Sequence, residues 1–443
     1  MIEQVLQLLQ ERKYADVKAA ALNMHYADIA EVFERLDEDR ESALLFFRLL
    51  PKELAAETFA YMEPDVQAHI IGAITDRELR YILDDLYLDD YVDLIEEMPA
   101  NVVKRVLQNS SRENRKLVNQ YLQYPEDSAG SIMTNEYVYF KQTATVQQAL
   151  NLIRKTGIDK ETINTCYVID NEHHLDGVVG LRELILADPD TVVERLMRTH
   201  IICANTHDDQ EEVAQMFSKY DMLSMPVVDN ENRLVGIITI DDVIDVLQDE
   251  TTEDMEKMAA IAPSDKPYLR TGIWETWKSR IPWLLLLMVS ATFTSMILMR
   301  FERALSTALI AFIPMLMDTG GNSGSQSSVT VIRSLSLGDI EFSDLLRVLW
   351  KEVRVAVLCG ITLALCNFAK LMLFDRVGLT VSIAVCLTLV CTVFFAKVVG
   401  CSLPMLAKRL GFDPAVMASP FITTIVDAAS LLIYVQISMW MLG

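Results

Sequence analysis

The amino-acid sequence predicts a multidomain membrane protein with an α-solenoid at its amino terminus, an α/β tandem pair in the middle and an all-α five-helix transmembrane domain. Residues 1 to about 125 follow a helical pattern and contain one glycine, Gly72. A motif of 19 residues that begins at Tyr167 recurs 59 positions later, at Pro226. Long uncharged runs, starting with residues 281–299, dominate the last third of the chain. We therefore expect a helical superhelix N domain at 1–128, the α/β pair at 129–248, a connecting helix at 249–275 and the membrane domain at 276–443.

The charge of the chain is divided in the same way. Residues 1–250 contain 48 acidic and 23 basic side chains, a net charge of about −25, whereas the rest contains 14 and 16. Such an acidic body argues against a nucleic-acid partner and against docking on anionic lipid. Divalent cations suit this surface, and a solvated acidic face is the alternative.

The seven cysteines contain no Cys-x-x-Cys pair, so neither a zinc site nor a disulfide framework is expected. The first residues do not resemble a signal peptide, which predicts a cytoplasmic amino terminus.

A short recurring pattern in the first 128 residues predicts one helix and one tight turn per repeat. An apolar residue close to an acid or a proline recurs with one spacing of 14 residues and then four of 12. These apolar residues are Leu36, Leu50, Met62, Ile74, Leu86 and Met98. A short fixed period is typical of helices stacked in an α-solenoid. Asp89 and Asp93, four residues apart, share one helical face and form an acidic edge.

The repeated motif predicts two copies of strand, Asp-Asn turn, strand and helix. Each copy is preceded by a further predicted helix, at 146–155 and 210–220. The duplication resembles a tandem pair of CBS domains, which act as regulatory sensors in many unrelated proteins. The resemblance therefore implies control of the protein rather than chemistry.

The last third predicts five spans, at 281–299, 304–333, 353–374, 377–400 and 412–442. A tryptophan belt at Trp274, Trp277 and Trp283 precedes the first of them. Basic residues, Lys397 among them, gather on the flanks that we expect to be cytoplasmic, which fixes a cytoplasmic amino terminus in a multi-pass protein of the cell membrane. We expect the ionisable groups deep in the membrane to be acids.

A run of small polar residues interrupts the second predicted span. After Met317 come Asp318, Gly320, Gly321 and Asn322, and the chain then becomes apolar again. Lipid-facing backbone must be bonded within its own helix, so a break at this depth predicts the lining of a water-filled path. Two alternatives stay open: Asp318 caps a helix that resumes after the break, and the small residues serve close helix packing.

A single carboxylate, Asp427, stands in the last predicted span. An ionisable residue at such a depth is a functional-site hypothesis by default, and a structural acid paired with a base is the alternative. Proteins hold Mg2+ through one or two carboxylates while several waters stay bound, so one acid from each chain of a symmetric dimer suffices. Thr423 and Thr424 precede it by one turn and offer further oxygen ligands. Asp413, directly before Pro414, fits an N-cap, with a cation at the inner mouth as a second role.

Two motifs, Gly-Gly-Asn-x-Gly-x-Gln-Ser-Ser and Asp-Pro-Ala-Val…Ser-Pro-Phe-Ile-Thr-Thr-x-x-Asp, together with the domain order, resemble the MgtE family of magnesium channels and transporters over essentially the whole chain. The resemblance implies a homodimeric Mg2+-selective channel with Asp427 of both subunits at the pore. Some relatives have Asn in the pore lining where Ser419 stands. The family closes when cytoplasmic Mg2+ binds between the N domain, the CBS pair and the connecting "plug" helix. The matching positions are Glu57, Asp89, Asp93, Gly130, Asp221, Asp242, Asp245, Glu250, Glu253 and Asp254. Some relatives also bind ATP in a region that corresponds to Val138, Tyr167, Pro226 and Asp241.

Other classes of function fit less well. A secondary carrier, Na+-coupled or open to other divalent cations, is the first competitor, although the five predicted spans show no internal inverted repeat. A CBS-gated anion channel conflicts with deep groups that are acids. An enzyme is not expected, because no metal-hydrolase motif, Gly-x-Ser-x-Gly or P-loop occurs.

Overall fold

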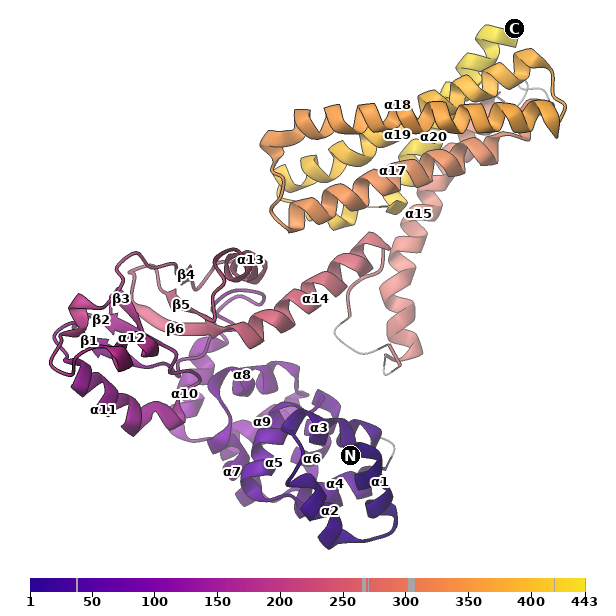
Figure 1. Ribbon diagram of the computed structural model, residues 1–443. Helices are drawn as coiled ribbons and strands as arrows, with labels where there is room; N and C mark the ends of the chain where they lie inside the picture. Colours follow the sequence, from indigo (N-terminus) through magenta and orange to yellow (C-terminus); the bar gives the residue numbers. More distant parts are fainter. Residues whose placement is uncertain (37–38, 265–267, 270, 302–306, 418, 443) are drawn as a thin grey trace. The chain divides into compact units, whose positions relative to one another are not determined.

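The computed structural model describes residues 1–443 except 37–38, 265–267, 270, 302–306, 418 and 443, and side chains also except those of residues 89, 159, 307, 308, 419 and 442. The chain divides into two compact units, Met1–Val246 and Leu247–Gly443 (Figure 1).

The described residues up to Tyr121 form ten short helices. They are α1 (Ile2–Gln10), α2 (Tyr14–Ala21), α3 (Tyr26–Arg35), α4 (Arg40–Leu49), α5 (Lys52–Ala60), α6 (Pro64–Ala73), α7 (Asp76–Asp85), α8 (Leu88–Glu97), α9 (Ala100–Asn109) and α10 (Arg112–Tyr121). Successive helices begin 12 residues apart, except that α4 begins 14 residues after α3. Helices two apart in sequence pack together, as α3 does on α5 and α5 on α7. The predicted period of one helix and one turn is confirmed.

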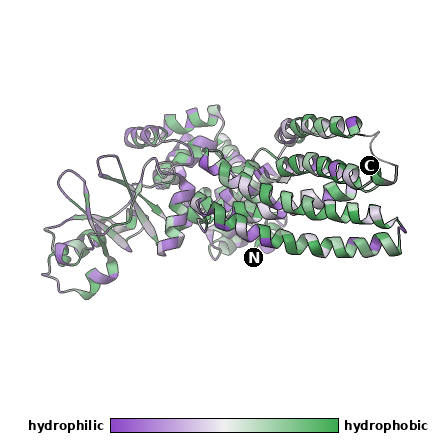
Figure 2. Ribbon diagram, turned by 90° about the horizontal axis from the view of Figure 1, so that it is seen from above, coloured by the Kyte–Doolittle hydropathy of each residue, from purple (hydrophilic) through white to green (hydrophobic). Residues whose placement is uncertain are grey.

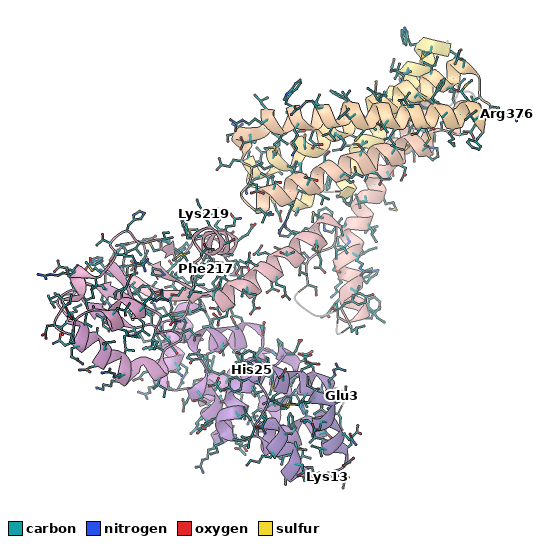
Figure 3. All side chains as sticks on the ribbon, viewed as in Figure 1. Glu3, Lys13, His25, Phe217, Lys219 and Arg376 are labelled. Carbon is teal, nitrogen blue, oxygen red and sulfur yellow. The ribbon has the colours of Figure 1, made fainter. Side chains whose placement is uncertain are left out.

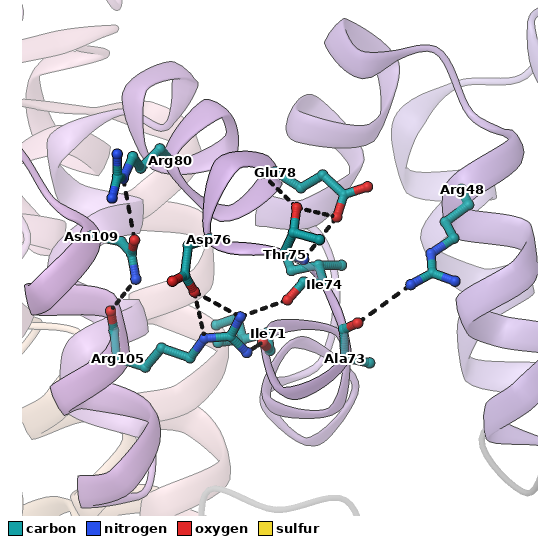
Figure 4. A network of polar contacts seen from close by, with 10 residues as sticks. All are labelled: Arg48, Ile71, Ala73, Ile74, Thr75, Asp76, Glu78, Arg80, Arg105 and Asn109. Atoms are coloured by element: carbon teal, nitrogen blue, oxygen red, sulfur yellow. Dashed lines mark hydrogen bonds and ion pairs between the residues drawn. The ribbon is translucent and has the colours of Figure 1, made fainter.

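Arg105 on α9 joins three of these helices (Figure 4). Its guanidinium donates to the carbonyl oxygens of Ile71 and Ile74 at the end of α6, the second at 2.5 Å. It also pairs with Asp76 Oδ1 at 3.0 Å, at the start of α7. Thr75 caps α7 through a reciprocal capping box. These bonds satisfy carbonyls that a helix end leaves without an intrahelical partner, so the chain can stop and restart a helix within a few residues.

Two three-stranded sheets follow in the same unit. One contains β1 (Tyr139–Lys141), β2 (Thr165–Ile169) and β3 (Leu175–Gly180), and the other β4 (Ala204–Asn205), β5 (Ser224–Val228) and β6 (Leu234–Thr239). In each sheet the first strand runs parallel and the third antiparallel to the second. The predicted strand, turn and strand are confirmed in both copies. Strands β1 and β4 were not predicted, because segments of three and two residues carry no readable period.

Helices α11 (Val146–Thr156), α12 (Leu181–Leu186), α13 (Gln210–Tyr220) and the start of α14 (Ile240–Met258) complete the two α/β copies. Helix α13 has the bounds predicted from the sequence. Its Phe217 is 1% exposed while Lys219, two residues on, is exposed. Figure 3 labels both residues on this helix. Helix α14 continues without a break through the predicted boundary at residue 248.

The two α/β copies share a core. Its buried members are Tyr137, Tyr167, Ile169, Leu175, Val228, Leu234 and Ile237. Tyr137 donates its hydroxyl to the carbonyl oxygen of Leu234 at 3.1 Å, and the hydroxyls of Tyr167 and Ser224 lie 3.2 Å apart. A second continuous core joins the amino-terminal helices to the second copy. Backbone bonds support it, since the Ala129 N–H donates to Asp208 O at 2.8 Å.

The carboxyl-terminal unit contains the rest of α14, then α15 (Ile273–Phe301), α16 (Thr307–Ile310), α17 (Ile313–Ser336), α18 (Leu345–Leu373), α19 (Leu379–Arg409) and α20 (Ser419–Leu442). Figure 2 shows that its long helices are mostly hydrophobic. Among the described residues, four segments are long and apolar enough to cross a membrane: Ile273–Phe301, Phe342–Leu373, Leu379–Arg409 and Ala415–Met441. The remaining predicted span corresponds to α17, which packs against α19 and α20.

The predicted break in the second span is wrong. Helix α17 is continuous from Ile313 to Ser336 and passes through both glycines and Asn322. Two adjacent glycines cost a helix about 1 kcal/mol each relative to alanine. Packing against two neighbouring helices offsets that cost, so tertiary contacts decide the outcome here.

The glycines of α17 serve close packing, one of the alternatives left open by the sequence. A Cβ on Gly320 would lie 2.6 Å from Thr392 Cγ2 on α19 and 2.9 Å from Val426 Cγ1 on α20. At the next crossing the carbonyl oxygen of Gly324 lies directly against Gly400 of α19. Only residues without a side chain allow backbones to approach this closely.

Candidate functional site

An exposed polar face follows α17. Asp318, Asn322 and Gln326 are spaced by four residues and are all exposed. Asn322 Nδ2 donates to Asp318 Oδ2 at 3.2 Å. Ser327 and Ser328, by contrast, are buried. Residues four apart lie on one side of a helix, so the polar run presents amides and a carboxylate outward and hydroxyls inward. The capping alternative for Asp318 is wrong, because the helix begins upstream of it.

Asp427 lies on α20, partly buried and within electrostatic reach of Asp318. Among the ion pairs of the described residues, none joins a lysine or arginine to Asp427. Thr423 and Thr424 donate their hydroxyls to the carbonyl oxygen of Pro420, at 2.9 and 3.1 Å.

The glycine that follows Gly320 brings this part of α20 close to α17. A Cβ on Gly321 would lie 3.0 Å from Thr423 Cγ2. The structure thus brings Asp318 and Asp427 together from two helices. The side chain of Ser419, the first residue of α20, lies outside the described residues.

The prediction that all deep ionisable groups are acids is wrong. Lys397, expected on a cytoplasmic flank, is 5% exposed on α19. Its Nζ lies 3.7 Å from Glu352 Oε2 on α18. Helix α19 continues to Arg409, beyond the predicted end at residue 400, and this places Lys397 inside the helix bundle.

A lysine joins the end of α14 to the membrane helices. Lys257 Nζ lies 2.5 Å from Glu253 Oε1 and 2.7 Å from Asp413 Oδ2. Burial alone would lower the pKa of Lys257, but hydrogen bonds to Asp413 and Glu253 raise it to about 12. On the same helix, Asp254 Oδ2 accepts a bond from Ser336 Oγ at 2.9 Å. Burial raises the pKa of Asp254, although the bond from Ser336 opposes this.

Asp413 also has the capping role predicted for it. Its Oδ1 accepts the Ala415 N–H at 2.8 Å, in the turn that precedes α20. Met258, next to Lys257, packs against the buried pair Ile332 and Ala415. Three predicted ligands, Glu253, Asp254 and Asp413, therefore lie at one end of the bundle. Glu250 lies one turn before Asp254 on α14.

A cluster of carboxyl groups lies where α8 meets the second α/β copy. Burial, followed by repulsion from Asp242 and Glu57, raises the pKa of Asp90 to about 6. Burial and then repulsion from Glu97 and Asp90 raise the pKa of Asp93, which keeps an exposed edge, to about 7. Burial likewise raises the pKa of Asp242 to about 6. These acids repel one another, so a bound divalent cation would stabilise their contact.

Glu161 is a member of this cluster that the sequence did not reveal. It follows the 3-10 turn Gly157–Asp159, and its Oε2 atom is buried without a hydrogen-bond partner in the described part of the chain. Burial, followed by repulsion from Asp241 and Asp242, raises its pKa to about 7. The segment between helix and strand is longer here than in the second copy, so the repeat offers no matching position.

The other predicted metal ligands lie around this cluster or apart from it. Burial, then Asp85, raises the pKa of Glu57, and burial, then Asp241, raises that of Asp245. Asp221 ends α13 in the left-handed conformation, with φ of 50°. Gly130 donates its N–H to Thr206 O at 3.0 Å. The side chain of Asp89 lies outside the described residues. Within the described residues, no group of three or more His, Cys, Asp or Glu side chains is placed to hold a metal ion.

The candidate ATP region is mostly protein core. Tyr167 and Val138 are 0% and 2% exposed, and Pro226 is buried as well. The Tyr167 N–H donates to Val138 O at 2.9 Å. Asp241 is exposed at the start of α14, so it is the member of this set that a ligand in solution can reach.

Family models of known proteins match three successive parts of the chain, and curated relatives match nearly all of it. The family model described as "Divalent cation transporter" matches residues 313–437, the "MgtE intracellular N domain" matches 24–127, and "CBS domain" matches 129–190 and 193–249. A curated relative from Thermus thermophilus, "Magnesium transporter MgtE", is 38% identical over 97% of this chain and 96% of its own length. The protein of the same name from Bacillus subtilis is 32% identical over 99% and 96%.

Solved structures agree with this assignment for the amino-terminal unit. The cytosolic domain of the Mg2+ channel MgtE in complex with ATP is 36% identical, with a TM-score of 0.53, and covers 56% of this chain and all of that one. The soluble part of a magnesium transporter is 30% identical, with a TM-score of 0.52. The chain therefore combines an MgtE-type N domain and a pair of CBS domains with a divalent-cation transporter domain. It belongs to the MgtE family.

Proposed function

We propose that this protein is a Mg2+-selective channel of the cell membrane that admits Mg2+ and closes when cytoplasmic Mg2+ is plentiful. The observation that carries the proposal is similarity over the full length, since relatives matched over 97% and 99% of this chain are both named magnesium transporters. In this proposal the amino-terminal unit is cytoplasmic and acts as the sensor.

The proposed ion path follows the exposed face of α17 and the adjoining part of α20. Two chains form a homodimer, and Asp427 of each meets on the twofold axis to hold an ion that keeps most of its water. Asp318 and Asn322 line the path, because both are exposed on one side of a helix in the bundle and Asp318 interacts with Asp427. Water bound to Mg2+ would be held by amide and carboxylate oxygens along this face.

The proposed gate uses the repulsion among the acids of the amino-terminal unit. Asp90, Asp93, Asp242 and Glu161 all have raised pKa values, because each is partly desolvated beside other carboxyl groups. Divalent cations would relieve that repulsion and hold the N domain on the CBS pair. Their loss would release the connecting helix and open the path. Lys257 would then be the contact that keeps the end of α14 on Asp413.

We further propose ATP as a modulator, because a related cytosolic domain of 36% identity was solved in complex with ATP. Asp241 is the candidate contact for it, since its side chain is exposed.

The pore assignment is tested by the substitution Asp427→Ala. Loss of the carboxylate removes the charge that binds the ion, so we expect Mg2+ uptake into proteoliposomes to vanish while the dimer still assembles. Asp339→Ala, which removes an exposed acid between α17 and α18, is the matched control and should leave uptake unchanged. Normal uptake by Asp427→Ala would refute the pore assignment.

The gating assignment is tested by removing residues 1–130. The shortened channel lacks α8 and the acids it carries, so internal Mg2+ should close it only at much higher concentration. Single-channel recording across a titration of cytoplasmic Mg2+ measures this directly. Closure at the same concentration as in the full chain would contradict the proposal, and flux without unitary current steps would favour a coupled carrier.

A further inference from the structure

Three helices of the carboxyl-terminal unit meet at a buried charged cluster made of Ser327 on α17, Glu352 on α18 and Lys397 on α19. Ser327 Oγ donates to Glu352 Oε2 at 2.6 Å. Lys397 Nζ donates to Ser327 Oγ at 3.2 Å and lies 3.7 Å from Glu352 Oε2. The side chains of Lys397 and Glu352 are only 6% and 13% exposed. Each member of the cluster therefore contacts the other two.

The cluster lies well inside its helices. At 1.5 Å per residue, Lys397 is roughly 18 Å from the end of α19 and Glu352 roughly 10 Å from the start of α18. A charged side chain at such a place is costly unless it is paired, and residues of this kind tend to be functional. The pair itself has no net charge, so it adds little to the potential that a passing cation experiences.

The contacts of α17 show how the pair of Glu352 and Lys397 can hold this helix in place. Against α19 and α20 this helix packs through glycines, Gly320 and Gly324, which offer close approach but no directional bond. Ser327 supplies the directional contact, because its hydroxyl both donates to a carboxylate and accepts from an ammonium. The neighbouring residue Gln326, together with Asp318 and Asn322, faces outward. Holding Ser327 in place therefore sets the rotation of α17 about its axis and its position along that axis, and with them the position of the exposed polar face.

We propose that Glu352 and Lys397 are positioning residues that hold α17, through Ser327, in the register its polar face needs for ion passage. The inference rests on the proposed function, because it assigns that face to the ion path. It goes beyond that function by naming a charged pair that does not itself touch the ion.

The first test separates Ser327 from an equivalent neighbour. Ser327→Ala removes the link to α17 and leaves the ion pair, whereas Ser328→Ala removes a buried hydroxyl on the same helix that has no hydrogen-bond partner among the described residues. We expect Mg2+ flux per reconstituted dimer to fall roughly tenfold in Ser327→Ala, the factor that corresponds to about 1.4 kcal/mol, and to stay unchanged in Ser328→Ala. Equal flux in the two variants would overturn the proposal.

The second test uses the pair itself and the full-length protein in detergent. Glu352→Met and Lys397→Met each leave one buried charge unpaired, so both should lower the melting temperature and the flux. The double variant leaves no charge and should regain most of the melting temperature. Its flux should stay low, because Ser327 has lost both partners. Full flux in the double variant would show that the pair serves stability alone.

The two proposals fail in different ways. A wild-type protein that carries no Mg2+ would refute the proposed function, whatever the variants do. Wild-type flux together with an unaltered Ser327→Ala would refute the positioning role alone. Melting temperatures that fall additively in the double variant would show that Glu352 and Lys397 do not act as a pair, which also overturns it.

Discussion

Glu161 shows how a single residue becomes important through its surroundings. In the sequence it follows a lysine in an irregular segment, and nothing about that position is unusual. In the folded unit its carboxyl group faces Asp241, Asp242 and Asp90, all of which raise its pKa after burial has done so. Its charge therefore opposes the contact between the N domain and the CBS pair unless a cation or a proton neutralises it.

Substituting Glu161→Gln should reduce the electrostatic repulsion that opposes the contact between the N domain and the CBS pair. Removal of one charge from the cluster should raise the free energy of unfolding of residues 1–250 without Mg2+ above pH 7, because the raised pKa of Glu161 means that its charged form destabilises the folded unit. The stabilisation produced by added Mg2+ should become smaller. Melting temperatures with chelator and with Mg2+ measure both effects. Glu172→Gln, at an exposed turn, is the matched control; a variant less stable than wild type in chelator would contradict the prediction.

Among the elements, α17 depends most on its neighbours. Its amino-acid pattern suggests an interruption, yet it is continuous, because α19 and α20 pack against its glycines. The same packing leaves one face uncovered, and Asp318 and Asn322 lie there. Helix α17, whose sequence predicts a break, is thus a complete helix with one polar side.

The crossing of α17 and α19 should tolerate no added methyl group at Gly400. A Cβ there would collide with the backbone carbonyl of Gly324, which cannot move without shifting the helix. We expect Gly400→Ala to destabilise the full-length protein by roughly 1–3 kcal/mol, as overpacking does. Gly360→Ala is the control, since its Cβ would meet Val390 at 3.4 Å, an ordinary contact. Equal melting temperatures for the two variants would rule out this account.

At the scale of the amino-terminal unit, the raised pKa values predict a dependence on pH. The carboxyls of Asp90, Asp93, Asp242 and Glu161 titrate near 6 to 7 in the folded unit, compared with about 4 in an unfolded chain. The folded unit therefore binds more protons in this range, and its stability falls as the pH rises from about 4 through 7.

Residues 1–250 in chelator should accordingly melt at a lower temperature at pH 7.5 than at pH 5.5. Saturating Mg2+ should reduce the difference, because the ion replaces the protons, and Mg2+ should bind more weakly at pH 5.5. A series at constant ionic strength, with Na+ in place of Mg2+ as the control, measures this. A melting temperature that rises with pH in chelator would show that repulsion among these carboxylates does not destabilise the folded unit.

For the whole molecule, local periodicity predicted the short helices of the first unit and the longer strands of both sheets. The spacing of Leu50, Met62 and Ile74 gave the 12-residue helical repeat, and the second copy of the motif at Pro226 gave the paired sheets. Such patterns report which side of a helix or strand is buried, and that is a property of neighbouring residues in the chain. Asp413 before Pro414 likewise predicted its capping bond, because a cap is formed within a few residues.

Patterns along the chain therefore predicted the helical repeat, the duplicated α/β unit and the apolar helices, and they drew attention to the acids Asp318 and Asp427. The packing of distant segments was needed to show that α17 is unbroken, that Lys397 is buried beside Glu352, and that Glu161 joins the acidic cluster. The physical reason is that burial, ion pairing and desolvation are set by atoms from distant segments. A pattern of neighbouring residues contains no record of them.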